Sequence, residues 1–156
     1  MPKVTGVPFR FREATAAALF VCSGFPSMSL PLLINTRPYL AASAKGPVTP
    51  LVDFSNNIMH EVLHRYVNDC LEALPRKTTL LLEKYSTESQ AVRNHLHLYA
   101  IMELVYRQLG REKDLKVVFA AEQMFPKAWA TSKRAREIVI EEKAEIFARE
   151  LRGRRQ

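Results

Sequence analysis

The chain has 156 residues, of which 47% are apolar and 25% are charged, and it carries a formal net charge of +7. This composition excludes a disordered or membrane-embedded protein, and the length suits one hydrophobic core but not two. Two cysteines are too few for a disulfide framework or a cysteine-based zinc site. The positive charge permits an acidic partner and says nothing about the fold. We therefore expect one globular domain.

Residues 1–45 are predicted to form an N-terminal arm or a leader that contains one short strand. Within them, residues 14–22 form a compact apolar run that follows three basic residues. That order resembles a secretory signal, which would make the protein secreted or periplasmic. Without a signal function for this run, the protein would be cytoplasmic. Pro26 and Pro31 interrupt the segment, so we expect no transmembrane span.

Residues 46–156 are predicted to form a helical domain. The run at residues 32–34 predicts the strand that precedes it, and the small and polar composition of residues 41–50 indicates a loop. Five helices are expected beyond the loop. Three have start or stop signals: residues 53–74 with Asp53 or Ser55 as the N-cap, residues 86–109 between Ser86 or Thr87 and Gly110, and residues 115–124 before Pro126. The other two span residues 78–85 and 127–152. The predicted class is therefore α+β and predominantly helical.

The apolar residues of these helices recur at helical spacing and predict the core faces. The set expected to be buried comprises Met59, Leu63, Tyr66, Cys70, Val118, Ala121, Ile138, Val139 and Phe147.

The first long helix contains an H-E-x-x-H motif, His60-Glu61-Val62-Leu63-His64. On a helix, the two histidines lie about 40° apart around the axis and about 6 Å apart along it. Two imidazoles in that relation can converge on one zinc ion. Glu61 lies too far round the helix to be a third ligand, but it can reach a water molecule at the metal as a general base. One helical turn thus predicts two ligands and a base.

A catalytic zinc site usually has a third protein ligand. The short-spacing extension of the motif fails, because Val67 and Cys70 stand where its glycine and third histidine belong. The remaining candidates lie around the second long helix, and they are His95, Glu88, His97 and Glu103. His95 shares a stripe with Leu98, Met102 and Leu109 and should face the interior, so it is the predicted third metal ligand. Glu88 is the next candidate, because it lies two turns earlier on nearly the same line as His95. His97 lies about 200° from His95 around the helix.

The motif helix, followed by a second ligand-bearing helix, resembles the zincin metallopeptidases, specifically their long-spacing, gluzincin-like branch. The resemblance covers residues 53–110, and only the five-residue motif is specific. It implies a zincin-like fold whose motif helix packs on a second ligand-bearing helix, with few preceding strands here. That branch usually takes a third ligand from an E-x-x-x-D pattern, but Val92 stands where the aspartate would follow Glu88. His95 therefore stays open as the ligand.

The resemblance implies a zinc-dependent metallopeptidase that acts on a peptide or protein substrate. Glu61 would take a proton from the attacking water and pass it to the leaving amine. A further donor would stabilise the developing oxyanion, and Tyr99, His97 and Arg107 are all open candidates for that role.

Two other functions compete with the peptidase. One is a zincin-like protein that binds zinc without catalysis, since few strands precede the motif. The other is a basic helical nucleic-acid-binding protein, since residues 127–156 carry nine basic residues against five glutamates. The glutamates alternate with the basic residues at helical spacing, which indicates a salt-bridged surface and does not favour nucleic acid as a partner.

Overall fold

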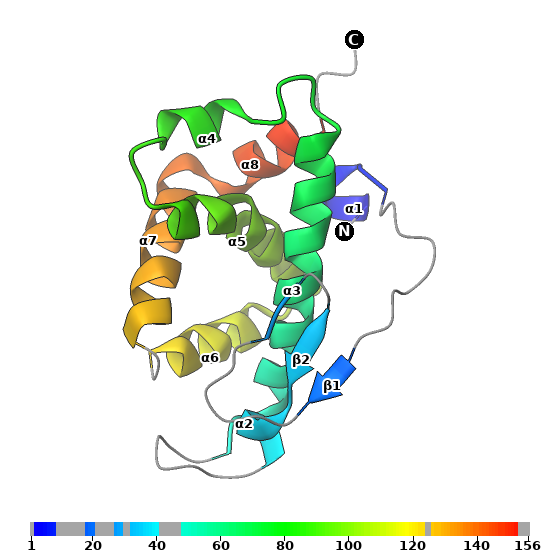
Figure 1. The fold of residues 1–156 in the computed structure, drawn as a ribbon, viewed down its shortest axis with the longest axis vertical. Helices are drawn as coiled ribbons and strands as arrows, with labels where there is room; N and C mark the ends of the chain where they lie inside the picture. The colour runs from blue at the N-terminus through cyan, green and yellow to red at the C-terminus, as the bar shows by residue number, and fades with distance from the viewer. Residues whose placement is uncertain are drawn as a thin grey trace.

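The computed structural model describes residues 2–8, 18–20, 27–29, 32–40, 48–123 and 126–152. Over these residues the protein is predominantly helical, as predicted (Figure 1). The elements in chain order are α1 (Pro2–Thr5), β1 (Ala18–Phe20), β2 (Leu33–Asn35), α2 (Arg37–Leu40), α3 (Leu51–Glu72), α4 (Leu80–Lys84), α5 (Gln90–Gln108), α6 (Glu112–Glu122), α7 (Pro126–Glu142) and α8 (Ala144–Leu151).

The strands form one small parallel pair, in which Leu19 of β1 lies opposite Ile34 of β2. The predicted strand is confirmed as β2, and β1 lies within the apolar run of residues 14–22. The rest of that run, and most of the predicted loop at residues 41–50, lie outside the described residues. In the described part of the chain β1 and β2 are the named strands, so the several-stranded sheet that a zincin places before its motif helix is not shown.

Helix α5 lies at the centre of the helical body. It packs against α3, α7, α8, α6 and the short α1. Leu96, Leu98 and Ile101 point in different directions around its axis, and each is fully buried. A helix that is apolar on several faces must be enclosed by others, which explains this central position. The predicted core residues Leu63, Tyr66, Cys70, Val118, Ile138, Val139 and Phe147 are buried, and Met59 packs against the core.

Helix α3, which carries the H-E-x-x-H motif, crosses α5 and spans much of the length of the molecule (Figure 1). Its N-terminus differs from the prediction. The helix begins at Leu51 after Pro50, and no side chain caps it, so Asp53 or Ser55 as N-cap was wrong. Proline before the first turn sets the entry of the chain without a capping side chain. Tyr66 joins the N-terminal segment to this helix, because its hydroxyl contacts the Thr5 hydroxyl of α1 and donates to the Val7 carbonyl oxygen at 2.8 Å.

The boundaries of the other helices show which local signals decided them. Gly110 adopts the left-handed conformation after α5, as predicted. Thr79 caps α4, a helix for which the sequence analysis named no cap. Ser89 rather than Ser86 or Thr87 caps α5. A single helix was expected over residues 127–152, but the structure has two. Lys143, with a φ of 69°, interrupts the helical conformation between α7 and α8.

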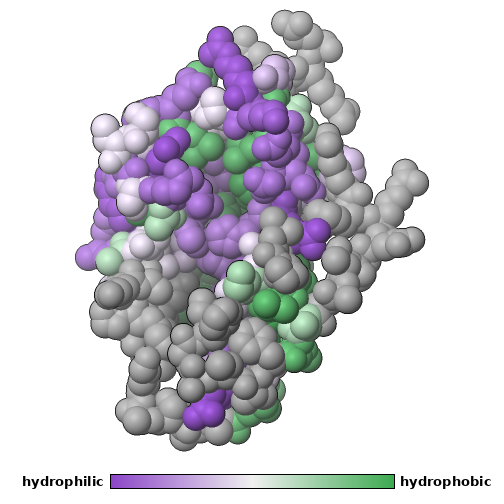
Figure 2. Space-filling model, in the orientation of Figure 1, coloured by the Kyte–Doolittle hydropathy of each residue, from purple (hydrophilic) through white to green (hydrophobic). Residues whose placement is uncertain are grey.

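The face shown in Figure 2 is mainly hydrophilic over the upper helical body, whereas hydrophobic side chains gather lower, near the strands and the start of α3. Leu19, Leu40 and Leu51 are exposed apolar residues of these lower elements. Within the described residues, no helix combines the length and apolarity needed to cross a membrane.

Candidate metal centre

Three histidine side chains come together where α3 crosses α5. His60 and His64 lie one turn apart on α3, and His95 lies on the adjoining face of α5. One ring nitrogen from each of the three lies within 4.8 Å of the others. The ring centroids are 4.7–5.1 Å apart. We call these three residues the histidine triad.

The spacing of the two motif histidines is close to that of two ligands on one metal ion. The Nε2 atoms of His60 and His64 lie 3.1 Å apart. Two nitrogen ligands on one tetrahedral zinc ion, each bonded at 2.0–2.1 Å, would be about 3.3 Å apart. Three imidazoles form a donor set that suits zinc and leaves a fourth position for water or substrate. Without a metal, the same contact is an N–H···N hydrogen bond between two neutral rings.

The Nδ1 atom of His95 takes part in a hydrogen bond within α5. The Nδ1–H group donates to the backbone carbonyl oxygen of Ala91 at 2.6 Å, one turn earlier on α5. This bond selects the tautomer whose Nε2 carries a lone pair. Metal-bound histidines commonly have such a backbone partner, which fixes the ring orientation.

The triad favours neutral imidazoles, the form that binds metals. Burial lowers the pKa of His60 well below its ordinary value, and the nearby His64 and His95 lower it further. Burial and the neighbouring His95 lower the pKa of His64 to about 4. Burial also lowers the pKa of His95, although its bond to Ala91 opposes the shift. All three rings are therefore uncharged at neutral pH, and no proton competes with a metal ion.

Glu61, the predicted general base, is a buried residue of the same helix, with 8% of its surface exposed. Burial raises the pKa of its carboxyl group to about 7. A carboxyl group with that pKa can both accept and release a proton near neutral pH. Such a shift is typical of acid–base residues in functional sites.

The other candidates for a third ligand lie in different surroundings. Glu88 precedes α5, because the helix begins only after Ser89, and its Oε1 accepts from Arg134 at 2.6 and 2.8 Å. Glu103 forms an ion pair with Arg107 at 2.5 Å. His97 is 1% exposed, and its Nε2 lies 3.1 Å from Glu150. The structure thus places His95 beside the two motif histidines, and it gives Glu88, Glu103 and His97 other partners.

Among the three candidate oxyanion donors, Tyr99 adjoins the triad. Its ring centroid lies 5.9 Å from that of His60 and 5.6 Å from that of His95. Its hydroxyl forms a 2.7 Å hydrogen bond with the Ser132 hydroxyl of α7. Arg107 instead bonds Glu103 and Glu145.

An aromatic cluster that the sequence analysis did not identify continues from Tyr99. The Arg136 guanidinium of α7 lies over the rings of Phe119, Trp129 and Tyr99, at 3.7, 4.7 and 6.0 Å from their centroids. These residues come from α5, α6 and α7, and no short-range motif joins them. The one local signal in the sequence is the four-residue spacing of Ser132 and Arg136, which places these two residues on the same face of α7.

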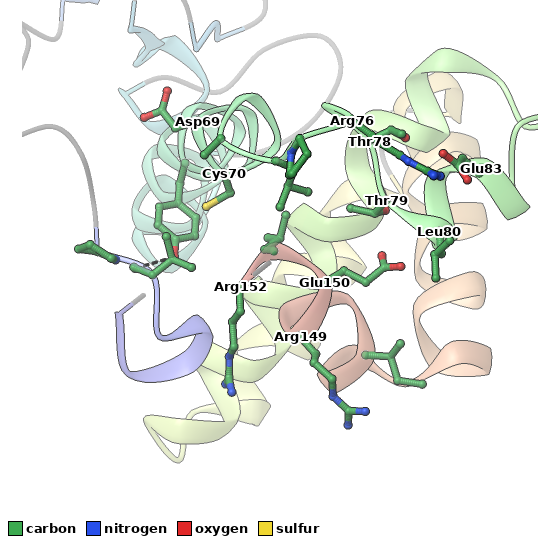
Figure 3. Close-up of a pocket in the computed structure, with 18 residues that line it drawn as sticks. Asp69, Cys70, Arg76, Thr78, Thr79, Leu80, Glu83, Arg149, Glu150 and Arg152 are labelled. Atoms are coloured by element: carbon green, nitrogen blue, oxygen red, sulfur yellow. Dashed lines mark hydrogen bonds between the residues drawn. The ribbon is translucent and has the colours of Figure 1, made fainter. Parts of the chain in front are cut away.

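A pocket of about 1220 Å³ lies away from the triad, between the C-terminal half of α3, the segment after it and α8. Figure 3 shows Glu150 extending toward Thr79, while Arg149 and Arg152 extend to the opposite side. His97 contacts two of the lining residues, since its Nε2 lies 3.1 Å from Glu150 and 3.4 Å from Thr79. The charged residues that line the pocket are three acidic and three basic side chains, so their formal charges cancel: Asp69, Glu83, Glu150, Arg76, Arg149 and Arg152.

No protein-family model, no curated protein and no solved structure matches the chain.

Proposed function

We propose that the protein is a zinc-dependent metallopeptidase in which His60, His64 and His95 hold the metal. The observation that carries the proposal is the convergence of the three imidazole nitrogens, on the helix that also bears Glu61. When bound at such a site, zinc acidifies a water molecule and polarises a carbonyl group.

Glu61 supplies the proton transfer in this proposal. With a pKa of about 7, its carboxylate can take a proton from water as the water attacks a peptide carbonyl. The resulting carboxylic acid can then protonate the leaving amine. Burial supports both steps, because it brings the pKa of the acid close to neutral pH.

Tyr99 supports the site in a different way. Its ring packs at an interplanar angle of 26° against His95. Its hydroxyl bond to Ser132 fixes this ring relative to α7. The aromatic side chain therefore orients His95 and shields one side of the triad from water.

The test separates metal binding from catalysis. Zinc content is measured by plasma emission spectroscopy after reconstitution, in the wild type and in His60→Ala, His64→Ala and Glu61→Gln variants. We expect about one zinc per wild-type chain, loss in both histidine variants, and retention in Glu61→Gln. No zinc in the reconstituted wild type would contradict the proposal.

Hydrolysis is then followed with internally quenched peptides of varied sequence. Glu61→Gln should lower kcat by about 10²–10⁴-fold, which is the usual contribution of a general base. Zinc binding without Glu61-dependent hydrolysis would instead identify a non-catalytic zinc protein. The nucleic-acid alternative has less support, because Lys133 and Arg134 of α7 lie close to Glu137, and Arg134 also bonds Glu88.

A further inference from the structure

Asn56 of α3 carries a buried hydrogen-bond acceptor that lacks a partner. Only 5% of its surface is exposed, and its side-chain oxygen Oδ1 is buried and makes no hydrogen bond within the described part of the chain. Nearly all buried polar groups of native proteins have a partner, because an unpaired one keeps the full cost of leaving water. This acceptor therefore marks a place where a donor belongs.

His60, one turn further along the helix, has the complementary deficit. Its Nε2 lies 3.1 Å from that of His64, so this nitrogen faces the proposed metal position. Among the residues that the structure describes, this contact is the one hydrogen bond of the His60 ring. A hydrogen on the other ring nitrogen, Nδ1, therefore has no acceptor.

An asparagine and a histidine at this spacing lie side by side. Helix α3 is continuous from Leu51 to Glu72, so the two residues are about 40° apart around its axis and about 6 Å apart along it, with their Cβ atoms about 5–6 Å apart. Helix α5 shows that an asparagine oxygen can accept across the same spacing, because Gln90 Nε2 donates to Asn94 Oδ1 at 2.6 Å. A direct bond or one bridging water molecule can thus join the Asn56 acceptor to Nδ1 of His60.

Metal binding supplies the donor that Asn56 lacks. Without a metal, one of the two facing Nε2 atoms of His60 and His64 must carry a hydrogen, and a neutral His60 that carries it there has none on Nδ1. A neutral His60 whose Nε2 lone pair binds a metal ion carries its hydrogen on Nδ1 instead. The unpaired oxygen of Asn56 thus fits the metal-bound tautomer of His60.

We propose that Asn56 is a positioning residue of the metal site, whose Oδ1 accepts the Nδ1–H of metal-bound His60 directly or through one water molecule. This inference rests on the proposed function for the presence of the metal. It gives His60 the kind of outer partner that the Ala91 carbonyl oxygen gives His95. Such a partner fixes the orientation of the ring and makes the imidazole a more basic ligand.

Zinc affinity of the full-length protein, measured by competition with a chelator of known affinity, is the first test. Asn56→Leu removes the acceptor at similar side-chain volume and should weaken zinc binding about 10–100-fold, the usual effect of losing an outer partner. Without metal, the same variant should unfold at an equal or higher denaturant concentration than the wild type, because a buried unpaired acceptor is gone. Weaker zinc binding without a loss of stability separates positioning from a merely structural role.

Two further variants locate the effect. Asn56→Asp keeps an acceptor, and a carboxylate forms the stronger bond, so this variant should bind zinc at least as tightly as the wild type. Asn57→Leu is the matched control on the same helix. The Asn57 amide donates to the Ser27 hydroxyl at 2.9 Å, about 100° further round the helix from Asn56, and its loss should leave the zinc affinity within a few-fold of the wild type.

Nitrogen-15 NMR of the zinc-bound protein gives a readout that does not depend on how any variant folds. In the wild type, Nδ1 of His60 should carry a hydrogen that exchanges with water at least about 10-fold more slowly than that of a free imidazole, because it is hydrogen-bonded. In Asn56→Leu this exchange should become faster. The Nδ1–H of His95 is bonded to Ala91 and should exchange equally in both proteins.

The outcomes separate this inference from the proposed function. Unchanged zinc affinity in Asn56→Leu, an equal loss in Asn57→Leu, or an unprotected Nδ1–H of His60 in the zinc-bound wild type would overturn the positioning role alone. Zinc binding without Glu61-dependent hydrolysis would contradict the peptidase and leave the role of Asn56 standing, since its readouts report on metal binding. A reconstituted wild type without zinc would overturn both.

Discussion

His95 donates its Nδ1–H to the backbone carbonyl oxygen of Ala91 at 2.6 Å, and this bond holds the His95 ring beside His60 and His64. A histidine that could present either nitrogen is thereby restricted to one. The bond forms within a single helix and needs no metal, so the metal-free chain is already organised for binding.

The first prediction concerns His95 itself. His95→Ala removes one of the three proposed ligands and should weaken zinc binding by more than the roughly 10–100-fold that loss of an outer partner costs. Competition with a chelator of known affinity measures the change. His97→Gln is the matched control on the same helix, because the His97 ring contacts Glu150 and not the triad, and it should leave the zinc affinity within a few-fold of the wild type. Equal losses in both variants would contradict the assignment.

Sequence reasoning predicted local relationships well and tertiary ones less well. The spacing of His60 and His64 alone predicted that their rings share one helix face, and their Nε2 atoms do lie together. The position of His95 relative to them depended on how α3 crosses α5, which its apolar stripe indicated only in part. That stripe also included Leu109, which is 65% exposed in the structure. The role of His95 as a ligand stays a prediction until metal is measured.

Other features had no local signal. Glu88 was expected on the line of His95, but Ser89 caps α5 and leaves Glu88 outside the helix, where Arg134 binds it. Ser86, Thr87 and Ser89 all have the chemistry of an N-cap, so the sequence alone could not choose among them. Arg136 meets its aromatic neighbours through contacts between three helices, which a single sequence does not encode at any fixed spacing.

The ionised Glu61 carboxylate should lower the stability of the folded protein, because the charge is buried. Its pKa is raised to about 7 by burial, so the folded protein binds more protons than the unfolded chain between about pH 4.5 and 7. Stability from this group is therefore present at low pH and is lost as the pH rises through 7. At pH 8, Glu61→Gln should stabilise the metal-free protein by about 1–3 kcal/mol. At pH 4 the two proteins should unfold at similar denaturant concentrations, and urea denaturation with a chelator present checks both values.

The triad has the opposite pH dependence. The pKa of His64 is lowered to about 4, so between about pH 4 and 6.5 the unfolded chain binds more protons, and stability falls as the pH falls. In a Glu61→Gln background with a chelator, lowering the pH from 7 to 5 should cost up to about 2 kcal/mol more than in the same protein with His64→Gln. Denaturation at the two pH values measures the difference. An equal pH dependence with and without His64 would show that its ring is not held neutral.

The contact between the buried His97 and the partly buried Glu150 should contribute strongly to stability. His97 is 1% exposed. Burial alone would raise the pKa of Glu150, but hydrogen bonds from His97, Thr79 and the Leu81 backbone hold it below its usual value. His97→Ala leaves this carboxylate without one partner and opens a cavity beside Phe147, so we expect a loss of about 3 kcal/mol.

A surface control shows whether burial causes that loss. Arg107 makes two ion pairs, with Glu103 and Glu145, but its side chain is 49% exposed. Arg107→Ala should therefore change the free energy of unfolding by about 1 kcal/mol or less. Both values come from chemical denaturation at pH 7, and a similar loss in the two variants would contradict the role of the buried pair.

The break between α7 and α8 predicts a stabilising substitution. Lys143 has φ 69° and ψ 127°, a backbone conformation that a side chain with a Cβ atom rarely adopts. The conformation lets α8 turn and bury Phe147 and Leu151, which are 0% and 2% exposed. Glycine adopts such angles without strain, so Lys143→Gly should raise the free energy of unfolding by about 1 kcal/mol, even though glycine is more flexible in the unfolded chain. Lys133→Gly, in the middle of α7, is the opposite control and should destabilise by a similar amount. Thermal unfolding at pH 7 distinguishes the two directions, and a lower midpoint for Lys143→Gly would mean that the positive φ carries no strain.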